Sequence, residues 1–360
     1  MKQLILLTTL LGLLASCQKQ AQKPATLNHL GQEVFLSGIN LAWIEFADDL
    51  RNLDVATFTR ALDELSAAGG NTLRWWIHVN GAHSPEFTDG RVTGIHPDDL
   101  KMMKHALDLA WERGVLVIPC LWSFDMLQPN AGEENWPRNK KLLEDVEYTQ
   151  AYIQNALIPM VEYLKGHPAI VAWEVFNEPE GMNAEVEWAG WTPVTTQTIH
   201  IQRFINLVAG AIRRVDPNAK VTNGSWNFVT MTDINGMTNQ YTDQKLIAAG
   251  GDSLGTLDFY QIHYYPEHFD ERTSPFHNPA SHWELDKPIL IGEFSAKGLV
   301  GKPAQSLTTL QAYKYAIENG YVGALSWTWT NHDGHGGLDD ATEALQTLQR
   351  DYPSFININR

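Results

Sequence analysis

Cysteine is scarce in this sequence, with two residues, Cys17 and Cys120, among 360. Cys17 ends a leader-like segment, so no disulfide is expected within the mature chain. Cys120 lies in the apolar run 115–121, where a thiol packs as a small hydrophobe and is a poor candidate for a catalytic nucleophile. A packed core must therefore stabilise the fold, and 44% hydrophobic with 19% charged residues is sufficient for one.

Positive charge is also scarce. The chain has 26 Lys and Arg residues against 42 Asp and Glu residues, for a formal net charge of -16. Phosphate backbones and anionic lipid surfaces repel such a protein. Nucleic acid and anionic membrane surfaces are therefore poor partners, and a neutral or cationic partner is favoured.

Several catalytic motifs are missing. The first apolar run ends in Ser37-Gly38-Ile39-Asn40, which lacks the glycine spacing of a dinucleotide site. The sequence has no Gly-x-Ser-x-Gly elbow, which argues against serine hydrolysis. It also has no helical His-x-x-x-His pair with a third ligand, so His263, His268, His332 and His335 are interpreted as residues around a cleft. We expect no cofactor and no metal.

The first 30 residues have the composition of an export leader followed by a tether. Lys2 precedes an apolar run from Leu4 to Leu14 that is too short to cross a membrane as a helix. Leu14-Ala15-Ser16-Cys17 resembles the signal of bacterial lipoproteins, which are cut before the cysteine and acylated on it. The mature protein would then be exported and anchored by lipid in the bacterial cell envelope or at the cell surface. We expect a signal peptide at 1–16, a lipidated Cys17 with a flexible tether at 17–30, and one domain at 31–360.

Short apolar runs alternate with helical patterns along the rest of the chain. Eight such strand-then-helix units with uniformly apolar strands indicate a parallel sheet closed on itself. The predicted fold class is α/β, a single-domain (β/α)8 TIM barrel, with a doubly wound open sheet as the competitor. The strand-like runs are Val34–Ile39, Thr72–Ile77, Val115–Leu121, Ile170–Phe176, Lys220–Asn223, Leu257–His263, Pro288–Phe294 and Val322–Trp329.

Capping residues mark the first two helices. Apolar residues at helical spacing follow Asp54 and stop at Gly69, which predicts a helix with Asp54 as its N-cap. Pro97 begins the next helix, acidic residues occupy its first turn, and Gly114 ends it. Further helices are expected at 142–164, 196–215, 243–249, 277–283, 306–319 and 342–350.

Two glutamates follow apolar runs at positions where a barrel places its chemistry. Asn177-Glu178-Pro179 ends the fourth run and Glu293 ends the seventh. The carboxyl ends of barrel strands meet at one rim, so these carboxyl groups can face each other. Two carboxyl groups flanking a bond are what glycoside hydrolysis requires, one as acid and the other as nucleophile or base.

These residues resemble glycoside hydrolase family 5 and its clan of retaining (β/α)8 glycosidases, over nearly the whole mature domain. The resemblance implies that Glu178 is the acid/base and Glu293 the nucleophile. It implies that Asn177 binds the sugar 2-hydroxyl and that Arg74 keeps the nucleophile ionised. It also assigns substrate-binding roles to His263 and Tyr265, the family's His-x-Tyr, and to Trp327, its tryptophan platform.

One departure concerns the third strand. The family often carries a histidine there, whereas Pro119-Cys120-Leu121-Trp122-Ser123 has none, so Trp122 is expected to line that part of the cleft. Trp43 and Trp329 also lie near strand ends, where flat rings can stack on sugars. Glu174 is interpreted as a buried partner for a basic or amide group. Residues 78–83, with His78, Asn80 and His83, are either a subsite wall or ordinary loop residues.

The sequence therefore predicts a retaining, endo-acting β-1,4-glycoside hydrolase, expected to be monomeric, with a β-linked polysaccharide or oligosaccharide as its partner. Its long loops and its Asn-Glu-Pro-Glu-Gly and Trp-Thr-Trp segments resemble the β-mannanase branch more than the cellulase branch. A cellulase or β-glucanase, a non-catalytic glycan-binding lipoprotein and a metal-dependent barrel hydrolase remain as alternatives. Carboxyl groups about 5 to 5.5 Å apart would indicate retention, and a gap above about 6.5 Å would count against it.

Overall fold

The computed structural model describes residues 23–187, 189–300 and 306–360. The predicted signal peptide at 1–16 and the predicted lipidation site Cys17 lie outside these residues. Within the described ranges, no helix is both long and apolar enough to cross a membrane.

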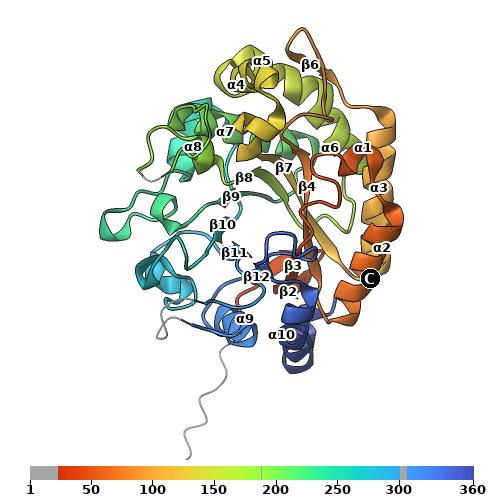
Figure 1. Cartoon of the computed structure of the whole chain (residues 1–360), viewed down its shortest axis with the longest axis vertical. Coiled ribbons are helices and arrows are strands. Elements are labelled where there is room, and N and C mark those ends of the chain that lie inside the picture. The colour runs from red at the N-terminus through yellow and green to blue at the C-terminus, as the bar shows by residue number, and fades with distance from the viewer. Residues whose placement is uncertain (1–22, 188, 301–305) are drawn as a thin grey trace, which may run out of the picture.

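Eight parallel strands close into a barrel in which each strand pairs with the next one along the chain. In Figure 1 the strands lie at the centre of the molecule and the helices surround them. The prediction of a single-domain (β/α)8 barrel is confirmed. The barrel strands are β3 (Leu36–Asn40), β4 (Thr72–Val79), β7 (Leu116–Ser123), β8 (Trp173–Asn177), β9 (Val221–Ser225), β10 (Tyr260–His263), β11 (Ile289–Glu293) and β12 (Gly323–Ser326).

The capping residues act as the sequence predicts. The Asp54 side chain accepts a hydrogen bond from the backbone N–H of Thr57, at 3.1 Å, at the start of the first long helix. Pro97 occupies the first turn of the next. The outer helices that follow the predicted pattern are α2 (Val55–Ala67), α3 (Pro97–Glu112), α7 (Thr198–Val215), α8 (Asp243–Gly250), α9 (Thr309–Glu318) and α10 (Leu338–Asp351).

The segment 142–164, predicted as one helix, is divided. Its first turn belongs to α4 (Trp136–Glu144), and α5 (Val146–Tyr152) then starts a new helix. Asp145 separates the two because it adopts an extended conformation and its side chain caps the N–H of Glu147, at 2.9 Å. A π-helical segment (Ile153–Leu157) joins α5 to α6 (Ile158–Leu164). The helix expected at 277–283 is a short 3-10 helix, Ala280–Trp283.

Three short elements carry no pattern that predicts them. Helix α1 (Asp49–Asn52) follows β3, and an antiparallel hairpin of β5 (Glu86–Thr88) and β6 (Arg91–Gly94) extends the loop after β4. Helix α11 (Pro353–Ile356) ends the fold. Each is too short for an apolar pattern to repeat within it, and such repetition is how helices and strands are recognised in a sequence.

The domain begins before the predicted boundary at residue 31. Strand β1 (Leu27–His29) pairs antiparallel with β2 (Gln32–Val34). Leu27 is buried against Leu36 and other residues at the base of the barrel. The predicted tether at 17–30 is therefore wrong for residues 27–29, which are part of the fold because an apolar side chain holds them to the core.

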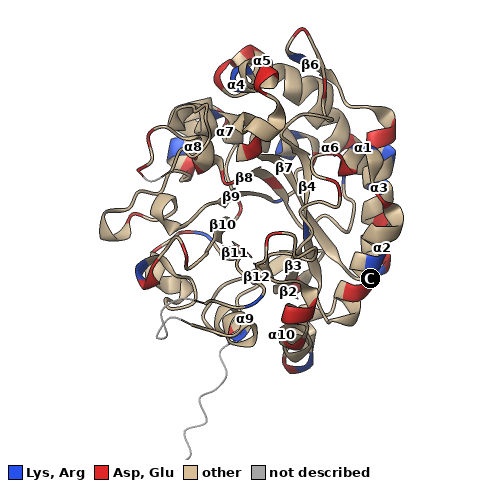
Figure 2. Cartoon of the chain, in the orientation of Figure 1, with Lys and Arg blue, Asp and Glu red and all other residues tan. Residues whose placement is uncertain are grey.

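The barrel interior holds a buried ion pair. Arg74 of β4, which pairs with Asn40 of β3 and Ile118 of β7, donates two hydrogen bonds of 2.6 Å to the two carboxylate oxygens of Glu174. Both side chains are fully buried, whereas Figure 2 shows many other charged residues on the surrounding helices, such as α5 and α10. Glycine at position 224 of β9 leaves room for this pair, because a Cβ there would lie 2.2 Å from Oε1 of Glu174.

We expect Gly224→Ala to lower the free energy of unfolding by about 1–3 kcal/mol, the usual cost of overpacking a core. The new methyl group would displace the Glu174 carboxylate and leave the buried Arg74 guanidinium poorly paired. Guanidinium-induced unfolding measures the change. Gly337→Ala is the control, since a Cβ there meets nothing closer than 3.4 Å. Equal stability of the two variants would contradict the role given to Gly224.

Candidate active site

The two glutamates predicted to act together lie at the same rim of the barrel. Glu293 is the last residue of β11, and Glu178 directly follows β8. Glu178 adopts a left-handed backbone conformation, with φ 43° and ψ 57°, before Pro179. Such a conformation is uncommon for a residue with a side chain and recurs at functional sites. A 2.7 Å hydrogen bond from the Glu178 N–H to the Gly224 carbonyl holds this turn.

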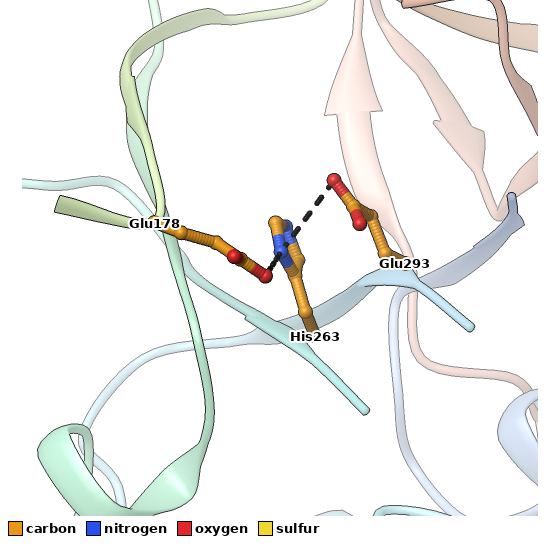
Figure 3. Close-up of side chains that lie close together, drawn as sticks. All are labelled: Glu178, His263 and Glu293. Atoms are coloured by element: carbon orange, nitrogen blue, oxygen red, sulfur yellow. Dashed lines mark hydrogen bonds and ion pairs between the residues drawn. The ribbon is translucent and has the colours of Figure 1, made fainter. Parts of the chain in front are cut away.

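His263, at the end of β10, lies between the two carboxyl groups, as Figure 3 shows. Its Nδ1 is 2.8 Å from Oε1 of Glu178 and 3.5 Å from Oε1 of Glu293. One ring nitrogen and one oxygen from each glutamate all lie within 4.8 Å of one another. Burial and the nearby positive charge of Arg74 lower the pKa of His263 well below its usual value, so the ring is neutral.

Glu293 is held by a donor on each oxygen. Nη1 of Arg74 donates to Oε1 at 2.6 Å, and the hydroxyl of Tyr265 donates to Oε2 at 3.0 Å. Burial raises the pKa of Glu293 to about 7, and these two donors act against that rise. Both contacts favour the ionised carboxylate.

Glu178 has a different environment. Burial, followed by the negative charges of Glu293 and Glu180, raises its pKa well above the usual value. The positive charge of Arg74 acts against this rise. Glu293 therefore gives up its proton first and Glu178 keeps its own, which is the division between an anionic group and a proton donor.

Arg74 connects the barrel core to the site. Besides Glu174 and Glu293, its guanidinium donates to the amide oxygens of Asn40 and Asn177, at 3.0 and 2.9 Å. The interpretation of Glu174 as a buried partner of a basic group is confirmed. Cys120 is also buried, beside this network.

A cavity of about 570 Å³ opens above the two glutamates. Two groups of aromatic rings line it on opposite halves of the rim. One comes from β4 and from the loops after β3 and β12, and the other comes from the loops after β7, β8 and β9. The lining residues are Trp43, Phe46, Trp76, Phe124, Asp125, Asn177, Glu178, Trp191, Trp226, Tyr265, His268, Glu293, Trp327, His332, Asp333 and His335.

Trp327 is fixed from two sides. Its ring lies 5.8 Å from those of Trp43 and Trp76, measured between centroids. Its indole N–H donates to a carboxylate oxygen of Asp333 in the loop after β12. His332, from the same loop, lies against Trp43 with a centroid distance of 4.6 Å. This loop therefore holds one wall of the cavity in place.

Two tryptophans predicted to line the cleft lie elsewhere. Trp122 is 1% exposed and packs against His78 and Tyr152, with ring centroids 5.0 and 5.3 Å away, behind the cavity wall. Trp329 donates to Glu64 at 2.9 Å and lies under Arg60, on the outer side of the barrel. Both predictions are wrong. Each ring packs against a residue that is distant in sequence, Tyr152 for Trp122 and Glu64 for Trp329, and so does not line the cavity.

Residues 78–83 do not line the cavity either. His78 is fully buried, with its Nδ1 3.0 Å from the hydroxyl of Ser84. Asn80 is 1% exposed, and its amide donates to the carbonyl of Asn130 at 3.1 Å. His83 lies 3.5 Å from Asp48. His78 belongs to β4, whereas Asn80 and His83 are loop residues, and none of the three forms a wall of this cavity.

Sequence reasoning missed several residues of the site. Asp125 lies on the rim after β7 and lines the cavity beside Phe124. Trp191 comes from the long loop after β8, and Phe46 follows β3. Asp125 had a usable signal, since it is an acidic residue four positions after the predicted barrel strand 115–121, at the rim that carries the chemistry. Phe46 and Trp191 had no comparable signal.

The chemistry of the site fits an acid/base pair better than a metal centre. In the described part of the chain, one group of His, Asp or Glu side chains, namely Glu178, His263 and Glu293, has the spacing to hold a cation. The guanidinium of Arg74 lies 2.6 Å from Glu293, and its positive charge disfavours a second cation there.

Comparison with known proteins agrees with this geometry. Residues 27–333 match the family described as cellulase (glycosyl hydrolase family 5). The chain is 36% identical to mannan endo-1,4-beta-mannosidase of Mytilus edulis, over 91% of this chain and 93% of that protein. It is 37% identical to the mannan endo-1,4-beta-mannosidase of Cryptopygus antarcticus, over 84% and 82%.

Solved structures share the fold along nearly the whole chain. The endo-1,4-beta-mannanase of Eisenia fetida superposes with a TM-score of 0.80 at 34% identity, covering 90% of this chain and 93% of that one. The beta-mannanase of the blue mussel Mytilus edulis gives a TM-score of 0.82 at 32% identity, covering 94% and 98%. The chain belongs to glycosyl hydrolase family 5 and is an O-glycosyl hydrolase.

Proposed function

We propose that this protein is an endo-acting β-1,4-mannanase that works with retention of configuration. The observation that carries the proposal is the pair of carboxyl groups at one rim, with oxygens within 4.8 Å of each other and with different surroundings. An inverting pair would be about 6.5–9.5 Å apart to admit a water molecule between substrate and base. This spacing supports direct attack by one carboxylate.

In the first step, Glu178 protonates the glycosidic oxygen while Glu293 attacks the anomeric carbon. The bond to the leaving sugar breaks and a covalent glycosyl-enzyme forms on Glu293. Arg74 and Tyr265 keep Glu293 anionic before the attack and hold its orientation. The neutral His263 places a ring nitrogen beside both carboxyl groups without adding a charge.

In the second step, Glu178 takes a proton from a water molecule while the water oxygen attacks the anomeric carbon. The bond between that carbon and the Glu293 oxygen breaks, which restores the Glu293 carboxylate and releases the sugar. The switch of Glu178 from acid to base has an electrostatic cause. Esterification removes the negative charge of Glu293, which is one of the charges that raise the pKa of Glu178. The pKa of Glu178 then falls, and its ionised form becomes accessible as a base.

The choice of mannan rests on the relatives, because the site itself contacts groups that several sugars share. The proteins from Mytilus edulis and Cryptopygus antarcticus are described as mannan endo-1,4-beta-mannosidases. Endo action is supported by the two aromatic groups on opposite halves of the rim, which offer stacking surfaces on both sides of the cleavage point. Cellulose and mixed-linkage glucan are the competing substrates. We further propose that the protein acts as a monomer, since one chain supplies the whole site.

We expect the purified protein to hydrolyse mannan and glucomannan with a higher kcat/KM than carboxymethylcellulose or barley glucan. Glu293→Ala should abolish hydrolysis but retain oligosaccharide binding, because the cavity walls remain. Reducing-end assays and isothermal titration calorimetry measure the two properties, and Glu162→Ala, at an exposed position on α6, is the control.

Each alternative has its own outcome. Preference for barley glucan would favour a β-glucanase, and loss of activity with a chelator would favour a metal-dependent hydrolase. Binding without turnover in the unaltered protein would indicate a glycan-binding module. Turnover by Glu293→Ala would remove Glu293 as the nucleophile.

We expect kcat/KM to follow a bell-shaped pH profile. The acidic limb reflects protonation of Glu293, which must be ionised, and the alkaline limb reflects loss of the proton from Glu178. Tyr265→Phe removes a hydrogen bond that lowers the pKa of Glu293. That pKa then rises and the acidic limb moves to higher pH, whereas Tyr163→Phe, at an exposed position, leaves it unchanged. An acidic limb that stays in place or moves to lower pH would contradict the role of Tyr265.

We also propose that the protein is exported and lipid-anchored through Cys17, on the strength of the apolar run and the Leu14-Ala15-Ser16-Cys17 motif. Expression in a bacterium with labelled palmitate should label the unaltered chain but not Cys17→Ala. Equal labelling of both, or of neither, would remove the anchor from the proposal.

A further inference from the structure

Asp125 is a buried carboxylate next to the catalytic pair that the mechanism above leaves without a role. It follows β7 in a short 3-10 helix, is 7% exposed, and lines the cavity. Its Oδ2 accepts a 2.5 Å hydrogen bond from the hydroxyl of Ser123, and its Oδ1 accepts a 2.8 Å bond from the amide of Asn130. Among the described residues no cation pairs with it.

The bond to Asp125 determines what Ser123 can offer its other neighbours. A serine hydroxyl has one hydrogen and two lone pairs. Because the hydrogen is donated to the Asp125 carboxylate, Oγ presents only lone pairs to its surroundings. It accepts from the amide nitrogen of Asn177 at 3.2 Å and from the backbone N–H of Asp125 at 3.3 Å.

The amide of Asn177 is thereby fixed from both ends. Its Nδ2 donates to Ser123, and its Oδ1 accepts from Nη2 of Arg74 at 2.9 Å. A flipped amide would place its NH2 group against the guanidinium and its oxygen against the lone pairs of Ser123, and both contacts would be repulsive. In this orientation one N–H of Asn177 is used by Ser123, and the other is left for the cavity that Asn177 lines.

We propose that Asp125 is a positioning residue, acting through Ser123 to orient the Asn177 amide so that its second N–H faces the sugar hydroxyl next to the anomeric carbon. The inference rests on the proposed glycosidase function. A donor held in place before the substrate binds costs no reorganisation during the reaction. Hydrogen bonds to the 2-hydroxyl strengthen in the transition state of glycoside hydrolysis. Orienting the Asn177 amide should therefore raise kcat more than it lowers KM.

Asp125→Asn tests this role with little change in shape. Ser123 and Asn130 donate to different oxygens of Asp125, and the amide replaces one of these oxygens by an NH2 group. If the oxygen serves Asn130, the NH2 group faces Ser123, and the serine hydrogen turns toward the NH2 group of Asn177. We expect kcat on a mannan oligosaccharide to fall about 10- to 100-fold, as for a reacting group misplaced by a fraction of an ångström to one ångström, with KM changed less than about twofold.

The decisive measurement is a double-mutant cycle of Asp125→Asn and Asn177→Ala, with kcat, KM and melting temperature for each variant. If Asp125 acts through Asn177, the double variant loses no more activity than Asn177→Ala alone. Ser123→Ala should behave like Asp125→Asn in both backgrounds. Asp98→Asn, at an exposed position on α3, is the control for removal of one negative charge.

Three results would overturn the proposal. Multiplicative losses in the double variant would mean that Asp125 acts independently of Asn177. A rise in KM with kcat unchanged would mean that Asp125 binds the sugar itself. A loss confined to a shift of the alkaline limb would mean that Asp125 acts only by charge on Glu178.

Different results would contradict the positioning role of Asp125 and the proposed substrate. If the unaltered protein hydrolyses barley glucan and not mannan, the substrate proposal is wrong, and the same cycle on glucan still decides the role of Asp125. If it hydrolyses mannan and Asp125→Asn is as active as the unaltered protein, only the positioning role is wrong. A protein that hydrolyses no β-glycan overturns both.

Discussion

The guanidinium of Arg74 is buried among groups that all accept hydrogen bonds from it, and the site is arranged around this one positive charge. Two hydrogen bonds to Glu174 anchor it in the barrel, and its remaining N–H groups face Glu293 and two asparagine amides. A buried charge left without partners is strongly destabilising, so these contacts are constraints on the fold as well as on the chemistry. Gly224 belongs to the same constraint, since it leaves the space that Glu174 occupies.

The charge balance explains why two similar glutamates behave differently. Arg74 supplies one positive charge, and Glu174 with Glu293 supplies two negative ones, so the buried site already carries a net negative charge. Ionising Glu178 would add another in a place where burial raises its pKa. Glu178 therefore retains its proton, which in the proposed mechanism passes to the leaving oxygen.

The fold and the centre of the site were predictable because both depend on local patterns. Apolar runs of strand length mark the barrel, and the polar residues that follow them, such as Glu178 and Glu293, fall at its catalytic rim. The N-cap Asp54 and Pro97 of the next helix follow the same local logic. The sequence patterns predict the structure best where the conformation of a residue depends on residues adjacent to it in the chain.

The errors concern residues whose positions depend on distant partners. Trp122 packs against Tyr152, and Trp329 donates a hydrogen bond to Glu64. The residues next to each tryptophan in the sequence give no indication of these contacts. The Ser123–Asp125 link to Asn177 joins two strand ends more than 50 residues apart, as the separation of 54 positions between Ser123 and Asn177 shows. One error has a local cause instead: the helical pattern of 142–164 is continuous, but Asp145 caps the N–H of Glu147 and starts a new helix there.

The central claim is that Glu178 and Glu293 carry out a double displacement. The configuration of the first product tests it most directly, since two displacements retain the configuration and one inverts it. Proton NMR of a mannan oligosaccharide during its first minutes of hydrolysis resolves the new reducing end before its anomers equilibrate. The account predicts that the β-anomer forms first, and initial formation of the α-anomer would contradict it.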